Sequence, residues 1–248
     1  MNAALIPVRS IAGAKQRLAG SLDEQGRERL AMAMLEDMLA ALQASTRLQR
    51  VIVVSSDRNL LRFAERCGAE VLEEGPARGL NAAVQFAAEE LERRGVTRLL
   101  VIPGDVPLLD PFEIDALFEV DAGRYPVIAV PSASASGTNA LVTDLPAGID
   151  FRFEGESLDA FRRECRSRNK EMLILVLEGF AIDLDTPADL DALPLRRGYR
   201  TCDFVAELRG VAMPGQLDEE DDEHDEDDLD DKSTDGDLTG DIPREEER

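Results

Sequence analysis

The sequence predicts an α/β fold in which one mainly parallel central sheet is flanked by helices. Short apolar runs of β type alternate with amphipathic helical patterns, and Gly- or Pro-containing segments separate them. Such alternation is typical of a parallel sheet whose crossover helices cover both faces. The chain has 248 residues and is 44% hydrophobic, which is enough for one large core.

The individual elements follow from these patterns. Apolar runs predict strands over residues 3–8, 51–55, 69–72, 99–102, 127–131, 139–143 and 172–177. Helical patterns predict helices over 27–43, 59–67, 80–94, 111–119 and 158–168, and one more starting at Pro187. Ser21 and Glu24 form a candidate capping box for the first helix, Asp57 is a candidate N-cap for the second, and Gly68 follows the end of the second.

The chain divides into a domain and a charged tail. We predict a domain over residues 1–200, a C-terminal extension over 201–215 and an acidic disordered tail over 216–248. The tail holds 18 acidic and three basic residues, so it supplies −15 of the formal net charge of −23. Because it has few large apolar residues and no aromatic one, it cannot bury enough surface to offset the entropy of ordering. A solubility tail is the simplest interpretation, and a partner-binding or metal-buffering segment is the alternative.

Composition argues against several classes of protein. The acidic excess would repel phosphates, so we expect no nucleic-acid partner. No apolar run approaches the roughly 20 residues of a membrane helix and no secretory signal is evident, so we expect no membrane partner and a cytoplasmic location. Cys67, Cys165 and Cys202 are too widely spaced for a zinc site or a disulfide framework. Since the only histidine, His224, lies in the tail, the chemistry must rely on carboxylates, lysine, arginine and metal.

A loop with two cations follows the first predicted strand. It contains the nucleotide-binding candidates Pro7, Val8 and Arg9, followed by Lys15 and Arg17. Small residues in the loop let backbone N–H groups approach phosphate oxygens, and Lys15 and Arg17 could neutralise charge developing between the α- and β-phosphates of a triphosphate. Lys15 is thus a candidate for both binding and catalysis, and Arg17 for catalysis. A solvated basic loop is the alternative, since no Walker A pattern is present.

Two further segments lie where ligands of a parallel sheet bind, at helix starts and after strands. Gly79 and Asn81 open an Ala-rich helix; Asn81 could bond a base or ribose edge, although asparagine there is also a common cap. Asp105 follows the strand at 99–102, and Gly104 keeps the space beside it open. Magnesium prefers few carboxylates plus phosphate oxygens and waters, so Asp105 is a candidate metal ligand and catalytic residue. A structural turn aspartate is the alternative.

A second carboxylate could come from the segment before the last predicted helix. Asp183 and Asp185 alternate with apolar residues, so both are expected to project from one face of a strand. We expect Asp185 to share a magnesium ion with Asp105. Asp183 should instead contact the ion through a water molecule or contact one of its direct ligands. A solvated strand face is the alternative. Asp189 lies in the first turn of the next helix, where compensation of the helix dipole is the simplest role.

Together these segments resemble the guanylyltransferase family of coenzyme F-420 biosynthesis, a branch of the molybdenum-cofactor-type nucleotidyltransferases with a GT-A-like, Rossmann-like fold. The resemblance spans roughly residues 3–193 and implies a nucleotidyltransferase domain over 1–200. It rests on the order and spacing of Pro7-Val8-Arg9 with Ala14-Lys15-Gln16-Arg17-Leu18, Gly79-Leu80-Asn81-Ala82-Ala83, Pro103-Gly104-Asp105-Val106-Pro107-Leu108, Gly137-Thr138-Asn139-Ala140-Leu141, and Asp183-Leu184-Asp185-Thr186-Pro187 with Asp189-Leu190.

The resemblance implies an enzyme that condenses GTP with 2-phospho-L-lactate, phosphoenolpyruvate or 3-phospho-D-glycerate and releases pyrophosphate. GTP and a small phosphorylated acid are then the partners, Mg²⁺ is the cofactor, and a homodimer is possible. By resemblance, Thr138, Gly155 and Ser157 bind the phosphorylated acid. The choice between GTP and another purine triphosphate stays open, as does the acid.

The acceptor segment departs from the family pattern. The family usually has Phe-Gly-x-Gly-Ser here and a histidine in the following helix, whereas this chain has Glu154 and Glu156 in the glycine positions and no histidine there. Two carboxylates would repel an anionic acceptor unless they turn outward or meet a nearby arginine. Two alternatives therefore remain: a nucleotidyltransferase for a molybdopterin-type or sugar phosphate, and a degenerate, non-catalytic nucleotide-binding module.

Overall fold

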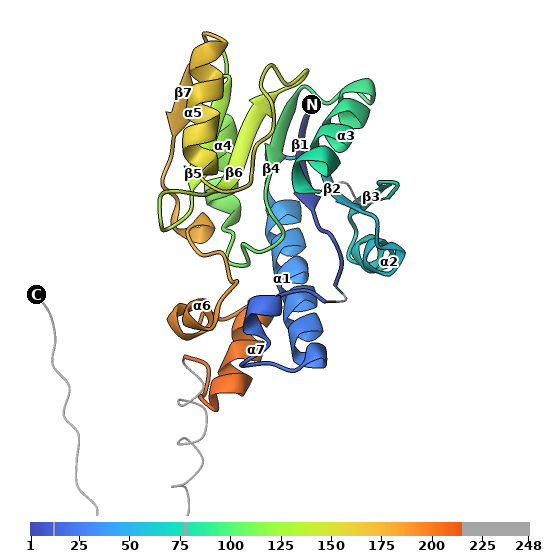
Figure 1. Cartoon of the computed structure of the whole chain (residues 1–248), viewed down its shortest axis with the longest axis vertical. Helices are drawn as coiled ribbons and strands as arrows, with labels where there is room; N and C mark the ends of the chain where they lie inside the picture. The colour runs from blue at the N-terminus through green and yellow to red at the C-terminus, as the bar shows by residue number, and fades with distance from the viewer. Residues whose placement is uncertain (12, 77–78, 215–248) are drawn as a thin grey trace, which may run out of the picture. The chain divides into compact units, whose positions relative to one another are not determined.

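The computed structural model of the chain describes residues 1–11, 13–76 and 79–214 (Figure 1). In this part of the chain seven strands form one sheet in the order β3-β2-β1-β4-β6-β5-β7. β6 runs antiparallel to both of its neighbours, and the other neighbouring strands pair in parallel, which confirms the mainly parallel sheet. The strands are β1 (Asn2–Pro7), β2 (Arg50–Ser55), β3 (Glu70–Glu73), β4 (Arg98–Val101), β5 (Val127–Pro131), β6 (Thr138–Asp144) and β7 (Met172–Ile174).

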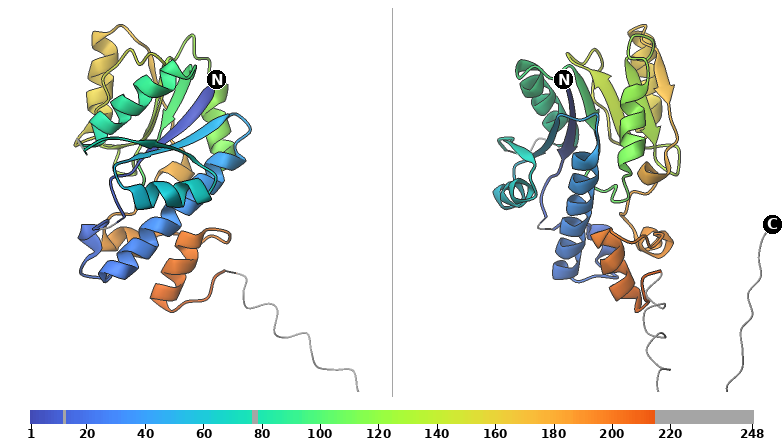
Figure 2. Two further views of the ribbon diagram at one scale, coloured as in Figure 1. Left: turned by 90° about the vertical axis from the view of Figure 1, so that its right-hand side faces the viewer. Right: turned by 180° about the vertical axis from the view of Figure 1, so that it is seen from behind.

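Helices cover both faces of this sheet (Figures 1 and 2). One face packs against α1 (Glu24–Ala44), α2 (Arg58–Arg66) and α4 (Pro111–Glu119). The other face packs against α3 (Leu80–Arg93) and α5 (Ser157–Ser167). The alternating side chains of the central strands feed the two cores in turn: Leu5 is buried under α3 and α5, whereas Ile6 is buried under α1 and α2. The predicted three-layer α/β architecture is therefore confirmed.

Local capping explains where the first helices start. α1 begins at Glu24 because the side chain of Asp23 accepts a hydrogen bond from the backbone N of Gly26 at 2.7 Å. The capping box predicted from Ser21 is therefore wrong, since the helix starts two residues later than that residue requires. The N-cap of α2 is Asp57, as predicted, and Gly68 after this helix has a φ of +84°, a left-handed conformation that favours glycine.

A third apolar cluster lies around the first half of α1. It gathers the short helix η1 (Gln16–Leu18), α6 (Pro187–Ala192) and α7 (Arg200–Arg209). Asp37 of α1 accepts hydrogen bonds from the backbone N atoms of Arg200 and Thr201, both at 2.8 Å, and so caps α7 from outside that helix. Residues Met1–Pro214 form one compact unit. The boundary at residue 200 stays a prediction, and the acidic tail predicted over 216–248 lies outside the described residues.

Two segments differ from the predicted strands. β7 ends at Ile174, three residues earlier than predicted, and η2 (Glu178–Phe180) follows it. The segment with Asp183 and Asp185 is not a strand: Leu184 is buried, and its N–H donates to the carbonyl oxygen of Asp105 instead of to a neighbouring strand. Among the described residues no helix is long and apolar enough to cross a membrane.

Candidate active site

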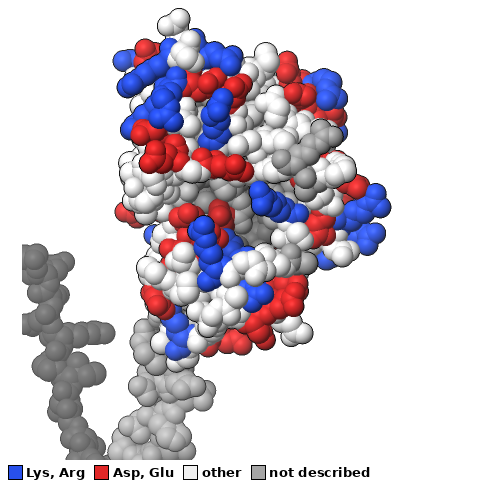
Figure 3. Space-filling model, viewed as in Figure 1, with Lys and Arg blue, Asp and Glu red and all other residues white. Residues whose placement is uncertain are grey.

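The candidate site lies at the carboxyl ends of β1 and β4, where the chain order of the sheet reverses. The chain runs outward from β1 through β2 to β3 and then returns to β4 on the other side of β1. Such a switch point leaves a crevice in which ligands of open α/β sheets bind. Here the crevice is a cavity of about 580 Å³, lined by the loop after β1, by Gly104 and Asp105 after β4, and by Asp185. Figure 3 shows this face hollowed near its middle, with acidic and basic side chains around the hollow.

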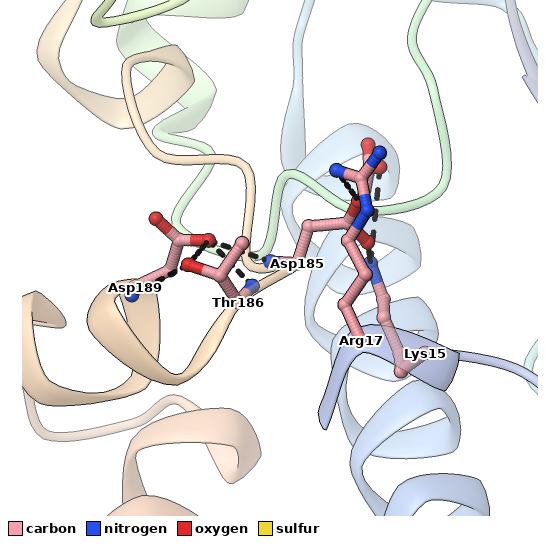
Figure 4. Close-up of polar contacts among 6 residues, drawn as sticks. Lys15, Arg17, Asp185, Thr186 and Asp189 are labelled. Carbon is pink, nitrogen blue, oxygen red and sulfur yellow. Dashed lines mark hydrogen bonds and ion pairs between the residues drawn. The ribbon is translucent and has the colours of Figure 1, made fainter. Parts of the chain in front are cut away.

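Lys15 lies between the two candidate metal ligands. Its Nζ is 3.1 Å from Oδ1 of Asp185 and 3.7 Å from Oδ2 of Asp105, and its side chain is only 9% exposed. The backbone of Lys15 is left-handed, with a φ of 53°, and this residue directly precedes η1. Arg17 contacts the other oxygen of the Asp185 carboxylate, with NH1 3.3 Å from Oδ2, but its side chain is 75% exposed (Figure 4). The structure thus brings together all four of these sequence-predicted residues.

A backbone hydrogen bond joins the two segments that carry Asp105 and Asp185. The N–H of Leu184 donates to the carbonyl oxygen of Asp105 at 3.0 Å, so the segment before α6 runs against the loop after β4. Since both carboxylate oxygens lie near one Nζ atom, they are at most about 7 Å apart, the sum of the two distances from that atom, which one hydrated magnesium ion can span. The two residues therefore meet although 80 positions separate them.

The charge balance at this point suits a divalent cation. Burial raises the pKa of Asp105; Lys15 opposes this rise, and the negative charges of Asp185 and Asp183 add to it. Asp183 is therefore close enough to act on Asp105 electrostatically, but no direct contact joins the two side chains. Among the described residues there is no cluster of three or more Asp, Glu, His or Cys arranged as a metal site. Two carboxylates are nevertheless the donor set that fits magnesium, which fills its remaining positions with water and phosphate oxygens.

Asp189 has a positioning role that the sequence did not reveal. Its Oδ2 accepts hydrogen bonds from the backbone N of Asp185 at 3.0 Å and from the N and Oγ1 of Thr186 at 2.6 and 2.8 Å (Figure 4). Burial would raise the pKa of Asp189, but these hydrogen bonds outweigh it and hold the pKa below its ordinary value. Thr186 and Asp189 form a capping box at α6. The Thr-Pro-x-Asp pattern could have predicted that box, but not the bond to Asp185.

Gly104 is required by packing. A Cβ atom at this position would lie 2.9 Å from Cγ2 of Val8, closer than real Cβ atoms approach, and 3.6 Å from the carbonyl oxygen of Pro7. The loops after β1 and β4 can therefore touch only because position 104 has no side chain. Pro7, Val8 and Arg9 line the same cavity, as the nucleotide-binding prediction requires.

The acceptor candidates form a second group, on β6 and at the start of α5. Thr138 is the first residue of β6 and Ser157 the first of α5; their hydroxyl oxygens are both buried and have no hydrogen-bond partner among the described residues. The two segments touch, because the N–H of Leu158 donates to the carbonyl oxygen of Ser136 at 3.2 Å. Gly155, just before α5, has a left-handed φ of 64°. Buried hydroxyls without partners are uncommon and fit a ligand that supplies the missing hydrogen bonds.

The glutamates of the acceptor segment turn outward. Glu154 and Glu156 are both exposed, and neither forms an ion pair with the described residues. The nearby arginines have other partners: Arg152 contacts Asp150, and Arg162 contacts Asp159. Of the two arrangements that would avoid repulsion of an anionic acceptor, the structure therefore shows the outward one and not pairing with an arginine.

Gly79 and Asn81 lie apart from the 580 Å³ cavity at Lys15, Asp105 and Asp185, which we call the phosphate-side cavity because the triphosphate is expected there. Gly79 has a φ of 97° and precedes α3, and neither residue lines the cavity at Lys15. The side-chain oxygen of Asn81 accepts a hydrogen bond from the backbone N of Phe153 at 2.8 Å. Asn81 thus links the start of α3 to the acceptor segment, which sequence patterns could not predict because 72 positions separate the two residues.

Comparison with known proteins identifies the family. The family described as "Guanylyl transferase CofC like" matches residues 2–214. A phosphoenolpyruvate guanylyltransferase from Conexibacter woesei is 37% identical over 192 residues, covering 77% of this chain and 86% of that protein. A 2-phospho-L-lactate guanylyltransferase from Methanothermobacter thermautotrophicus is 31% identical over 218 residues, covering 86% and 93%. A 3-phospho-D-glycerate guanylyltransferase from Phenylobacterium zucineum is 33% identical over 217 residues, covering 84% and 97%.

Solved structures support the fold. A candidate nucleotide-diphospho-sugar transferase from Desulfovibrio desulfuricans superposes with a TM-score of 0.69 at 18% identity, covering 84% of this chain and 95% of that one. A nucleotidyl transferase from Methanothermobacter superposes with a TM-score of 0.56 at 15% identity, covering 77% and 95%. With the match over residues 2–214 and relatives above 30% identity, the chain belongs to the CofC-like guanylyl transferase family and is a nucleotidyltransferase.

Proposed function

We propose that this enzyme transfers GMP from GTP to a small phosphorylated acid, with release of pyrophosphate, in coenzyme F-420 biosynthesis. The observation that carries the proposal is the meeting of Lys15, Asp105 and Asp185 at the switch point of the sheet. The relatives are named for three acids: phosphoenolpyruvate, 2-phospho-L-lactate and 3-phospho-D-glycerate. All three carry a carboxylate and a phosphate group, so the same acceptor chemistry applies to each.

The reaction requires positioning and charge neutralisation more than proton transfer. A phosphate oxygen of the acid attacks the α-phosphorus of GTP, a new P–O bond forms, and the bond between the α-phosphorus and the bridging oxygen breaks with pyrophosphate leaving. The acceptor phosphate is already ionised at neutral pH, so no general base has to remove a proton. The enzyme must instead hold two anions in line and offset their charge.

Asp105 and Asp185 would hold a magnesium ion, and Asp183 would act on it through water or through Asp105. When bound, this ion neutralises phosphate charge and polarises the α-phosphate. Lys15 would then turn from the two carboxylates toward the phosphates, since it lines the cavity in which the phosphates would lie. Arg17 and Arg9 would add positive charge at the departing pyrophosphate and along the loop after β1.

The acceptor would lie against β6 and α5. The hydroxyls of Thr138 and Ser157 are buried without partners among the described residues, so oxygens of an anionic ligand that reached them would accept a hydrogen bond from each. Gly155 precedes α5, whose first N–H groups favour a negative charge. The outward position of Glu154 and Glu156 removes the repulsion that would otherwise disfavour such an acceptor. The cytoplasmic location and the homodimer remain predictions.

The test is a pyrophosphate-release assay that crosses four nucleoside triphosphates with the three acids in the presence of magnesium. We expect GTP with at least one of the three acids to release pyrophosphate, and GTP without an acid to release none. Molybdopterin-type and sugar phosphates belong in the same assay as competing acceptors. Activity only with those acceptors would replace the proposed substrate, and no acceptor-dependent release at all would favour a non-catalytic module.

A further inference from the structure

Glu74 is a buried residue with a carboxylate that has no role in the proposed guanylyl transfer. It follows β3 directly and is only 8% exposed. Its backbone N donates to the carbonyl oxygen of Ser55 at 3.0 Å. Its side chain accepts no hydrogen bond and forms no ion pair within 4.0 Å among residues 1–11, 13–76 and 79–214. Its carboxylate oxygens are not among the fully buried atoms that lack a partner, and the residue lines a cavity, so the carboxylate is open to a ligand there.

The electrostatics of Glu74 agree with a carboxylate that has little positive charge near it. Burial raises the pKa of this carboxyl group, and the positive charge of Arg9 only partly offsets that rise. By contrast, the neighbouring Glu73 is half exposed and pairs with Arg58 at 2.8 Å. The contrast between the two adjacent glutamates shows that the burial of Glu74 is a property of its own position and not of the whole turn.

Glu74 lies on the same edge of the sheet as the phosphate-side cavity. β1, β2 and β3 are parallel neighbours, so their carboxyl ends share one edge. A short chain of contacts joins the two places: Glu74 N bonds to Ser55 O, and Ser55 Oγ bonds to Arg9 O at 3.1 Å. Two strand spacings of about 4.8 Å separate β1 from β3, which places Glu74 roughly 10 Å along the edge from the loop after β1. A nucleotide whose phosphates lie at that loop can reach this position with its base.

The space around Glu74 fits a flat aromatic ligand. A cavity of about 430 Å³ is lined by Glu74, by Pro76, Ala82 and Phe86, which is 40% exposed, and by Gln85 and Glu89, which hydrogen-bond to each other. An aromatic wall beside a few polar groups is typical of base-binding pockets, in which the base stacks on the ring and a polar group selects its edge. Of the two carboxylates in this lining, Glu74 is the buried one, whereas Glu89 is exposed and accepts a hydrogen bond from Gln85.

We propose that Glu74 selects guanine by accepting hydrogen bonds from its N1–H and its 2-amino group. The inference rests on the proposed function and adds the residue that chooses the nucleotide. A carboxylate offers only acceptors, and guanine is the common purine that presents two adjacent donors on one edge. Hypoxanthine presents one donor there. Adenine presents an acceptor at N1, and xanthine presents an oxygen at C2, so both would face the carboxylate with a lone pair.

Calorimetric binding of GTP, ITP, ATP and XTP to the whole chain, with magnesium and without an acid, tests this assignment. The wild type should bind GTP most tightly, ITP less and the other two least. Glu74→Gln should lose about 10- to 100-fold in GTP affinity, the usual size of a lost bidentate base contact. It should also gain affinity for XTP, because the amide offers one acceptor to N1–H and one donor to the oxygen at C2.

Glu73→Gln makes the same chemical change on the exposed neighbour and should leave all four affinities unchanged. Glu74→Asp keeps the charge and should keep the preference for GTP, which covers the case in which Glu74→Gln does not fold. An unchanged ratio of GTP to XTP affinity in Glu74→Gln, or a loss of base preference in Glu74→Asp, overturns the assignment but leaves the guanylyltransferase proposal intact. A wild type that binds no GTP would contradict that proposal itself.

Discussion

The N–H of Leu184 donates a hydrogen bond to the carbonyl oxygen of Asp105 at 3.0 Å. This bond ties the loop after β4 to the segment before α6, two parts of the chain that share no strand pairing. Leu184 is fully buried in the cluster beneath α1, so the segment cannot slide along the loop without exposing it. The carboxylates on either side, Asp105 and Asp185, are consequently held at one place, and Lys15 contacts both of them.

Asp105→Asn should reduce metal-dependent turnover by about 100-fold or more, because the amide cannot replace an anionic magnesium ligand and the ion supplies several kcal/mol of charge stabilisation. The fold should survive, since the amide has nearly the same shape. Burial disfavours the charge of Asp105 whereas the contact with Lys15 favours it, so we expect the thermal midpoint to change little.

The control for this variant is Asp191→Asn, which makes the same change on the exposed side of α6. It should retain full turnover. Undiminished activity in Asp105→Asn, measured over a range of magnesium concentrations, would remove this residue from the metal site.

Lys15→Ala should change turnover and metal affinity in opposite directions. Turnover should fall by about 100-fold, the usual cost of removing one preorganised charge from a transition state. Magnesium should bind more tightly to the ligand-free protein, because the ammonium group that contacts Asp105 and Asp185 no longer competes with the ion. Arg17→Ala should lower turnover but raise magnesium affinity less, since Arg17 contacts one carboxylate and is 75% exposed. Calorimetric titration with magnesium measures the metal affinity separately from turnover. Equal or weaker magnesium binding in Lys15→Ala would contradict the competition between the ammonium group and the ion.

The capping box at α6 should make stability depend on pH. Hydrogen bonds hold the pKa of Asp189 below its ordinary value in the folded protein. The folded state therefore binds this proton less readily than the unfolded state, so the stabilisation is complete above the unfolded pKa of about 3.9 and is lost as pH falls through the lower, folded pKa. Asp189→Asn should cost about 1 kcal/mol of unfolding free energy at pH 7, and the difference from the wild type should shrink below about pH 4. Urea unfolding at several pH values measures this difference; a constant difference would show that the charge of Asp189 contributes nothing.

The contact between Asp37 and α7 should be needed for the C-terminal helix to dock. Two backbone N–H groups of α7 donate to this carboxylate, and α7 has no side-chain cap of its own. Asp37→Ala should cost about 2 kcal/mol, because it leaves two helix-end donors unpaired in a buried place. Proteolysis should then cleave within residues 200–214 faster than in the wild type. Equal cleavage rates would show that apolar packing alone holds α7.

Much of the fold could be predicted because local patterns determine it. Short apolar runs and amphipathic stretches identified every strand of the described residues and all helices of the sheet layers, and Asp57 was identified as a cap from its place before α2. The helices missed in the described residues were α7 and the short η1 and η2. The start of α7 is capped by Asp37, 163 positions away in sequence, instead of by a residue of its own. The strand expected around Asp183 was wrong for a related reason: the alternation of apolar and acidic residues arose from one buried leucine between two partly exposed aspartates, and not from a pleated strand.

The candidate site was predictable by type and motif but not by geometry. The sequence identified Lys15, Asp105 and Asp185, because cations after one strand and carboxylates after others suit a nucleotide with its metal. It assigned Asp189 to the helix dipole, whereas the structure shows a hydrogen bond to Asp185. It assigned no role to Glu74, since burial of a carboxylate in a Glu-Glu-Gly turn is not visible in the local pattern.

The two hydroxyls of the acceptor segment should contribute to binding of the acid but not to stability. The oxygen atoms of Thr138 and Ser157 are buried without hydrogen bonds, so each already bears the cost of desolvation in the ligand-free protein. Thr138→Val and Ser157→Ala should therefore leave the thermal midpoint equal or slightly higher. In the presence of the acid, loss of one hydrogen bond to a charged oxygen should raise the KM for the acid by about 10- to 100-fold.

The KM for GTP serves as the internal control, because GTP is expected to bind at the loop after β1 and not at β6. Thr143→Val supplies a matched variant on the same strand: Thr143 is also buried, but its hydroxyl is engaged by the carbonyl oxygen of Asp144 at 3.3 Å. That change should lower the midpoint slightly and leave both KM values unchanged. If Thr138→Val and Ser157→Ala instead destabilised the protein and left the KM for the acid unchanged, the two hydroxyls would belong to the core and the acceptor would have to bind elsewhere.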